Sequence, residues 1–283
     1  MSGQILFYVV FLSQVLLISF FLPRQVLERV RYVVSTYPPS SYPRLYPVSL
    51  ERVERAQRNY RNMNLFMLVL GLALVARGFY APSEEMLNWD TTSVVFFYYL
   101  LQWSPLLIAL TAGFTYFNLK RKPDARTKRR AELRPRRLFD YVSPALVGVA
   151  AIVYVAFIVF IAYVRTFEFP WFGGYLNVLG ITVLNLVFAG TIAYYMYGKR
   201  KDPYKSYEDR AREIELNAKL LIFISIAATV YVALSICLSA FDMRHLGPIA
   251  QSLYFQVISV AAFRGFRIDK VNFEVYREEL AAT

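Results

Sequence analysis

Long apolar runs alternate with charged segments along the whole chain. A run of roughly 20 apolar residues is long enough to cross the ~30 Å hydrocarbon core of a bilayer as a helix. Seven runs reach or approach this length, over residues 5–22, 63–80, 92–117, 142–164, 175–197, 220–241 and 247–266. The pattern therefore predicts an all-α, polytopic membrane protein with about seven transmembrane helices in a single transmembrane domain, residues 1–283.

The seventh run is the most polar, because it contains Gln251, Gln256 and Ser259. Such a segment can cross the membrane, or it can be tilted or re-entrant beside six full spans. The sequence leaves this alternative open.

Lysine and arginine gather in every second connection, and this placement predicts the orientation of the chain. The basic segments are 23–62, 119–141, 199–219 and 267–283, whereas the other connections are short. Because cytoplasmic loops of membrane proteins collect Lys and Arg, we expect the N-terminus outside and the C-terminus inside, in a cytoplasmic (inner) membrane or a plasma membrane. The formal net charge of +12 then reflects topology, and we do not expect nucleic acid as a partner.

Segment 23–62 contains three Tyr-Pro pairs, which begin at Tyr37, Tyr42 and Tyr46. Proline fixes φ and favours extended geometry in the residue before it. We expect an extended loop along the membrane surface, followed by a charged helix that leads into the second span. Such a loop can be a stiff spacer or a docking motif for a partner.

After the first span, the pattern predicts three helical hairpins in the same orientation. Residues 150–156 in the fourth span resemble residues 227–233 in the sixth, and the third and fifth spans both end in Lys-Arg-Lys. The likeness suggests one helix followed by a parallel repeat of three hairpins, although apolar helices also match by chance. Small residues such as Gly71, Gly148, Ala150 and Ala151 predict close packing between helices.

The few polar residues inside the spans are candidates for a functional site, because polar groups are costly in a membrane. Gln102, Asn185 and Gln256 are the candidate lining of a polar pocket or pore. The alternative is that these amides only form hydrogen bonds between helices. Pro105, close to Gln102, predicts a break in the third span because it removes a backbone hydrogen bond.

Basic residues at both membrane surfaces form two further candidate sites. Arg77, Arg165 and Arg244 each lie near the outer end of the first helix of a hairpin, where they could converge on an anion or a lipid phosphate. They could equally extend singly to the headgroups. Candidate contacts with inner lipids or a partner are Lys120, Arg121, Lys122, Lys128, Arg129 and Arg130.

The sequence contains no motif that identifies a reaction. It has one cysteine, Cys237, and one histidine, His245, so we expect no cofactor and no metal. We expect a protein without enzymatic activity, of the transport or channel type, that acts as an oligomer. The alternative is a membrane scaffold or accessory subunit that recruits a partner through its basic segments. Membrane lipids, a second copy and a partner membrane protein are the expected partners.

Overall fold

The computed structural model describes residues 2–80, 89–121, 137–167, 169, 172–198, 205–264 and 271–277, without the side chains of residues 2–4, 89–92 and 112–121. The α-helices are α1 (Ser2–Leu16), α2 (Leu22–Thr36), α3 (Leu50–Tyr80), α4 (Trp89–Arg121), α5 (Pro144–Val164), α6 (Leu176–Tyr197), α7 (Tyr207–Ala240) and α8 (Gly247–Arg264). No strand occurs in these residues. The predicted all-α class is confirmed.

In the part of the chain that the structure describes, seven helical segments are long and apolar enough to cross a membrane. They include Arg244–Arg264, which contains α8 and the 3-10 turn η4 (Arg244–Leu246) before it. By length and composition, the most polar of the predicted spans can therefore cross the bilayer. The predicted polytopic membrane class is confirmed, while the membrane and the orientation stay predictions.

The first span is longer than the sequence predicts, because α1 continues into α2 through one π-helical turn, η1 (Leu17–Phe21). Pro23 is the second residue of α2, in its first turn. A proline inside a regular helix lacks a donor and clashes with the preceding turn, whereas an irregular turn before it relieves both problems. Pro23 thus lies in the first turn of a second helical segment, which begins at Leu22 and ends at Thr36.

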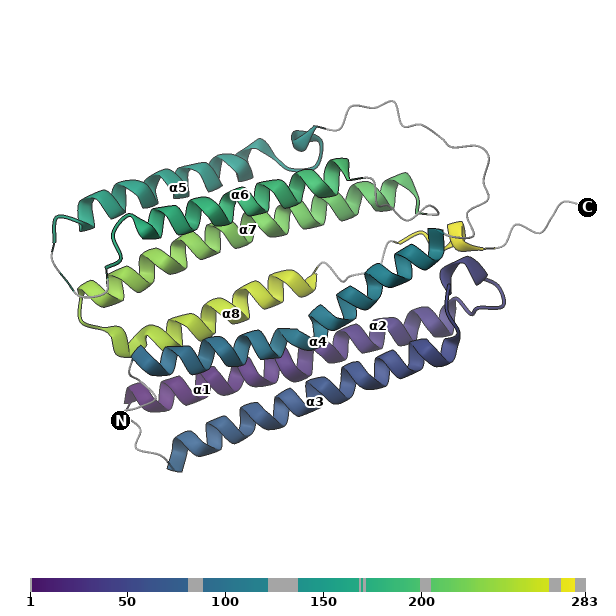
Figure 1. Cartoon of the computed structure of the whole chain (residues 1–283), viewed down its shortest axis with the longest axis horizontal. Helices are drawn as coiled ribbons and strands as arrows, with labels where there is room; N and C mark the ends of the chain where they lie inside the picture. Colours follow the sequence, from purple (N-terminus) through teal and green to yellow (C-terminus); the bar gives the residue numbers. More distant parts are fainter. Residues whose placement is uncertain are drawn as a thin grey trace, which may run out of the picture.

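The helices form two groups that lie side by side (Figure 1). α1–α2, α3, α4 and α8 make one group, and α5, α6 and α7 make the other. α8 packs against α1 and α4 within its group and against α7 of the other group, so it joins the two. α7 packs closely against both α5 and α6, whereas α5 and α6 touch each other much less.

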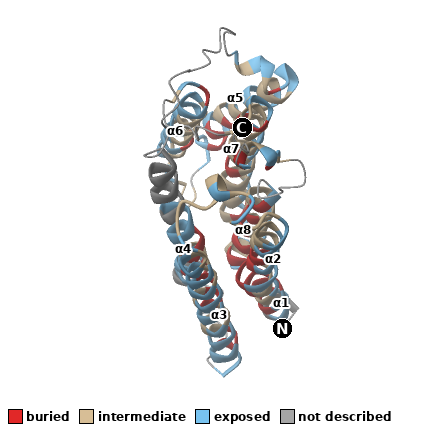
Figure 2. Ribbon diagram, turned by 90° about the vertical axis from the view of Figure 1, so that its right-hand side faces the viewer, coloured by how far each residue is buried: buried red, intermediate tan, exposed pale blue. Residues whose placement is uncertain are grey.

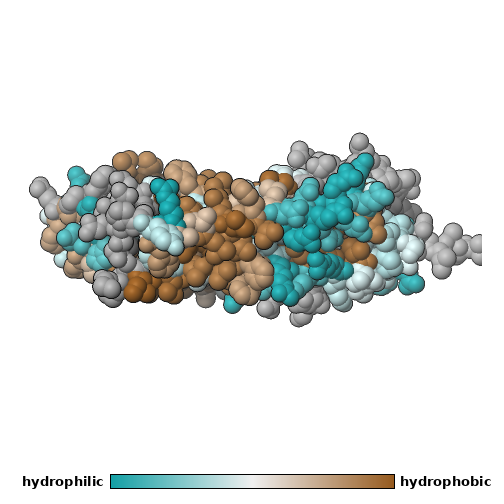
Figure 3. Space-filling model, turned by 90° about the horizontal axis from the view of Figure 1, so that it is seen from below, coloured by the Kyte–Doolittle hydropathy of each residue, from teal (hydrophilic) through white to brown (hydrophobic). Residues whose placement is uncertain are grey.

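Buried side chains concentrate on α1 and α8 (Figure 2). The largest core cluster contains Phe7, Phe11 and Val15 of α1, Tyr98 of α4 and Phe255 of α8. Figure 3 shows a hydrophobic surface over the middle of the molecule and a hydrophilic surface at the end where α2 and α3 extend. A band of exposed apolar side chains is what a lipid environment requires.

Small residues have two different roles. A side chain on Gly71 would overlap the Tyr98 hydroxyl, so α3 and α4 approach as closely as the sequence predicts. Gly148 has open space in place of a neighbour. Ala150 and Ala151, on the same helix, line a groove. The prediction of tight packing is wrong for Gly148, because no neighbouring helix lies within 4 Å of the position of its Cβ.

The repeated segments place their tyrosines alike. Tyr154 of α5 bonds to Thr182 of α6, with 2.5 Å between the hydroxyl oxygens. Tyr231 of α7 stacks on Tyr254 of α8, with ring centroids 4.5 Å apart. Each tyrosine thus contacts the second helix of its own hairpin, while a true duplication stays a prediction.

Candidate functional site

A chain of buried polar side chains connects α1, α4 and α8. The Ser252 hydroxyl donates to the Gln14 carbonyl oxygen at 2.6 Å. The Gln14 amide donates to Gln102 at 2.9 Å, and the Gln102 amide donates to the Ser19 hydroxyl at 2.9 Å. All four side chains are buried. Hydrogen bonds between helices satisfy groups that neither lipid nor a water-free core could satisfy.

Gln256 lies beside this network. Its amide donates to the Val10 carbonyl at 3.1 Å, and its carbonyl oxygen accepts from Ser13 at 3.2 Å. Both partners belong to α1. Gln256 therefore contributes to the contact between α8 and α1.

Pro105 lies inside α4 and bends it near its middle (Figure 1), but the helix continues from Trp89 to Arg121, so the predicted break is a bend. The proline leaves the carbonyl of Leu101 without its usual backbone donor. The Ser104 hydroxyl donates to that carbonyl at 2.7 Å. A neighbouring hydroxyl thus satisfies the backbone group that the proline frees.

A groove of about 610 Å³ separates α5 from α6, with α7 as its floor. Its volume is within the range of binding sites for small molecules. Four residues of the walls have small side chains, which leave the space between the helices open: Ala150, Ala151, Ala189 and Ala193. On α6 the lining extends from Thr182 to Tyr197. From Asn185 to Tyr197 a helix rises ~18 Å, about half of the ~30 Å hydrocarbon core.

Apart from Tyr197 at the other end, the polar side chains of the groove lie at its deep end. Tyr154 and Thr182 share one hydrogen bond, and the Ser225 hydroxyl donates to the Asn185 carbonyl oxygen at 2.6 Å. The other end of the Asn185 amide has no hydrogen-bond partner in the described part of the chain. Among the described residues, no charged side chain lines the groove. The groove thus presents an apolar channel with one free amide group near mid-membrane.

The three amides predicted to share a pocket lie in two places. Gln102 and Gln256 bond to α1, whereas Asn185 bonds to α7 and lines the groove. The helix groups that carry them are the two separate groups of the fold (Figure 1). Gln102 and Gln256 therefore match the alternative interpretation, in which the amides form hydrogen bonds between helices.

The outer arginines do not meet at one point. Arg77 lies near the end of α3 and Arg165 at the end of α5, and these helices lie at opposite edges of the molecule (Figure 1). The Arg165 guanidinium lies 4.8 Å from the centre of the Tyr175 ring. Arg244 is in η4, between α7 and α8. The structure therefore offers no shared anion site of Arg77 with Arg165.

The basic residues predicted to contact inner lipids lie outside the described side chains. Lys120 and Arg121 belong to α4, whose described side chains end at Thr111. Lys122, Lys128, Arg129 and Arg130 lie outside the described residues. Their role stays a prediction.

The Tyr-Pro segment is compact and binds the chain's own C-terminal region. Residues 38–41 form a turn, and Pro43–Leu45 form a 3-10 helix, so the predicted extended loop is wrong. The physical reason is that tertiary contacts hold the segment. Tyr37 stacks on Phe273 with ring centroids 4.3 Å apart, and the Tyr42 hydroxyl donates to Glu274 at 2.8 Å. This hydrogen bond raises the pKa of Tyr42 above its ordinary value.

Residues Val271–Arg277 form a strap between the two helix groups. At one end, the Asn272 backbone N–H donates to the Asp209 carboxylate at 3.1 Å. Asp209 is buried at the start of α7 and also accepts from the Ser206 hydroxyl at 2.8 Å. At the other end, Phe273 and Glu274 hold the Tyr-Pro segment that follows α2. The strap therefore ties α7 to α2 at the end of the molecule where the basic segments lie.

Sequence reasoning missed Gln14, Ser225, Ser252 and Asp209. A single Gln in an apolar run, such as Gln14, is a signal of the same kind as Gln102. The hydroxyls of Ser225 and Ser252 carry no comparable signal, because serine is common in spans and can bond to its own helix. Asp209 lies among many charged neighbours, and the sequence does not show which carboxylate is buried.

The described residues contain no group of three or more His, Cys, Asp or Glu side chains that could hold a metal ion. The groove between α5 and α6 is therefore the site best supported by geometry. Comparison with known protein families, with curated proteins and with solved structures found no match for this chain.

Proposed function

We propose that this protein is a transport-type membrane protein that binds an uncharged, largely apolar molecule in the groove between α5 and α6. One observation carries the proposal: the groove extends over about half the membrane and places the free end of the Asn185 amide at its deep end. An unpaired amide in an apolar environment is costly. A bound molecule with one hydroxyl, carbonyl or ester oxygen at that depth would satisfy it.

The absence of charge in the groove supports an uncharged molecule. An ionised headgroup near mid-membrane needs a counter-ion or water, and the lining residues that the structure describes include neither acid nor base. The lining is mostly apolar, with hydroxyl and amide groups near one end. This composition supports transport of a lipid-like molecule better than conduction of a hydrated ion.

The scaffold alternative loses one of its two arguments. The Tyr-Pro segment, a candidate docking motif, is occupied by the strap of the same chain. The basic segment 119–141 remains the other argument, and residues 122–136 of it lie outside the described residues.

Photo-crosslinking tests the proposal. The purified protein in lipid nanodiscs is irradiated with a long-chain fatty alcohol that carries a diazirine and an alkyne, and labelled peptides are identified by mass spectrometry. We expect labelling to concentrate on the lining of the groove. Ala189→Phe fills the groove and should remove most of this labelling.

Val187→Phe is the matched control. Val187 is two residues away on α6, is exposed and does not line the groove. It adds similar bulk on the lipid-facing side, so labelling should be unchanged. Even labelling of all lipid-facing helices, insensitive to Ala189→Phe, would contradict the proposal.

A further inference from the structure

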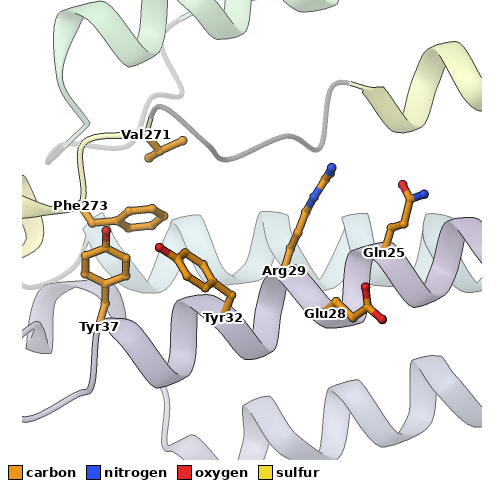
Figure 4. A pocket seen from close by; sticks show the side chains of 7 residues that line it. All are labelled: Gln25, Glu28, Arg29, Tyr32, Tyr37, Val271 and Phe273. Atoms are coloured by element: carbon orange, nitrogen blue, oxygen red, sulfur yellow. The ribbon is translucent and has the colours of Figure 1, made fainter.

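A second cavity, of about 570 Å³, lies between α2 and the strap (Figure 4). Side chains of α2, from Gln25 to Tyr32, form one wall, and Val271 and Phe273 of the strap form the other. The stacked rings of Tyr37 and Phe273 close one end. This cavity is far more polar than the groove of the proposed function, and it belongs to different elements.

The cavity lies at the level of lipid headgroups. The first span begins at Ile5, and a helix that rises 1.5 Å per residue crosses ~30 Å by Gln25 and ~36 Å by Arg29. The hydrocarbon core is ~30 Å thick. α8 runs parallel to α1, as the bond of Ser252 to Gln14 and the packing of Phe263 on Leu22 show, and it ends at Arg264 after a similar length. Both helices thus place the cavity at the membrane surface where the basic segments lie.

The charge that faces the cavity is positive. Glu28 is neutralised by Arg24, with 2.7 Å between its carboxylate oxygen and the guanidinium Nε. The Arg29 guanidinium extends into the cavity (Figure 4) and has no ion pair among the described residues. A guanidinium in this position favours an anion, and its planar fork matches a phosphate group through two parallel hydrogen bonds.

The other groups of the cavity suit the rest of a phospholipid headgroup. The Gln25 amide and the Tyr32 hydroxyl can donate to phosphate or glycerol oxygens. The Tyr37 and Phe273 rings offer an apolar surface beside them. Aromatic residues are favoured at this boundary, where one side is apolar and the other is wet.

We propose that this cavity binds the headgroup of an anionic phospholipid, with Arg29 as the ligand of its phosphate. The lipid connects α2 to the strap, because its phosphate is held by α2 and its glycerol region lies against Phe273. The site does not depend on the proposed function of the groove.

Native mass spectrometry of the full chain tests this site. The protein is purified in mild detergent, stripped of lipid, and titrated with phosphatidylglycerol or with zwitterionic phosphatidylcholine. We expect wild-type protein to retain phosphatidylglycerol in preference to phosphatidylcholine. Arg29→Gln should weaken retention of phosphatidylglycerol about tenfold, the effect of losing a charge-assisted hydrogen bond.

Arg31→Gln is the matched control, because Arg31 is exposed, lies two residues further along α2 and does not line the cavity. It should behave as wild type. Equal losses in the two variants would show diffuse attraction to a basic surface and would overturn the site. Elution volume and circular dichroism of each variant show whether it has folded.

Two further measurements locate the site and identify its source of phosphate. Phe273→Ala keeps every charge but removes one wall, so it should also weaken retention, and unchanged retention would contradict the location. Inorganic phosphate at the lipid concentration should not displace phosphatidylglycerol. Displacement by inorganic phosphate would assign the cavity to a soluble phosphate and would overturn the lipid assignment.

Discussion

Replacing Gln14 by leucine removes the central member of the polar network of α1, α4 and α8. The change keeps the size of the side chain but deletes its hydrogen bonds with Gln102 and Ser252. Both partners are buried, so neither can turn to water. We therefore expect a loss of stability without loss of the helical content.

The size of the loss follows from the number of bonds. Hydrogen bonds between helices in membranes contribute about 0.6 kcal/mol on average and up to ~1.7 kcal/mol. Gln14 makes two such bonds to other helices, so the expected loss is about 1–3 kcal/mol. The upper end applies if both partners stay unsatisfied, because a buried polar group without a partner costs ~1–3 kcal/mol.

Unfolding of the purified protein by SDS in mixed micelles measures this loss. Trp103, which lies beside the core clusters of α1 and α4, contributes to the fluorescence signal. A double-mutant cycle of Gln14→Leu with Gln102→Leu isolates their shared bond. A loss below ~0.5 kcal/mol for Gln14→Leu, or no coupling in the cycle, would refute the reasoning.

Three further predictions concern packing, titration and topology. Gly71→Ala should destabilise the protein by about 1–3 kcal/mol through overpacking against α4, whereas Gly180→Ala, which meets open space, should change the SDS midpoint little. The pKa of Tyr42 is raised in the folded protein, so its hydrogen bond to the strap should persist below pH ~10 and be lost only as the pH rises through the folded pKa. NMR of 13C-labelled tyrosine, with the Tyr42 signal assigned by Tyr42→Phe, should show that Tyr42 ionises above the ordinary pH range of tyrosine. Ionisation at or below that range would contradict this prediction. In a cysteine-free background, an impermeant maleimide applied from outside should label a cysteine in place of Phe172 but not one in place of Arg129, and the reverse pattern would overturn the predicted orientation.

The helix pattern was predictable because a membrane permits few backbone structures. A span must satisfy its own backbone, so an apolar run of sufficient length becomes a helix whatever its neighbours are. The boundary after Leu22 was not predictable in this way. A proline usually ends a helix, but the π-helical turn before Pro23 lets the helix continue to Thr36.

The candidate sites depended on which helices become neighbours, and the sequence says little about this. Gln102, Asn185 and Gln256 are polar for similar reasons, but α4 and α8 pack on α1 while α6 packs on α7. The groove exists because α5 and α6 both pack on α7 and hardly on each other. Small residues such as Ala151 and Ala189 predict a close contact or a gap equally well, and only the arrangement of the helices decides.

The position of α8 has a consequence for how the protein is made. α8 lies against both α1 and α4, yet the ribosome synthesises it about 230 residues after α1. Gln14 must therefore stay in the bilayer without Ser252 until the last span is inserted. Until then, the insertion machinery or temporary partner helices must stabilise the early helices and their polar side chains. A chain truncated before Gly247 should be degraded in the cell, even though six of its seven spans are complete.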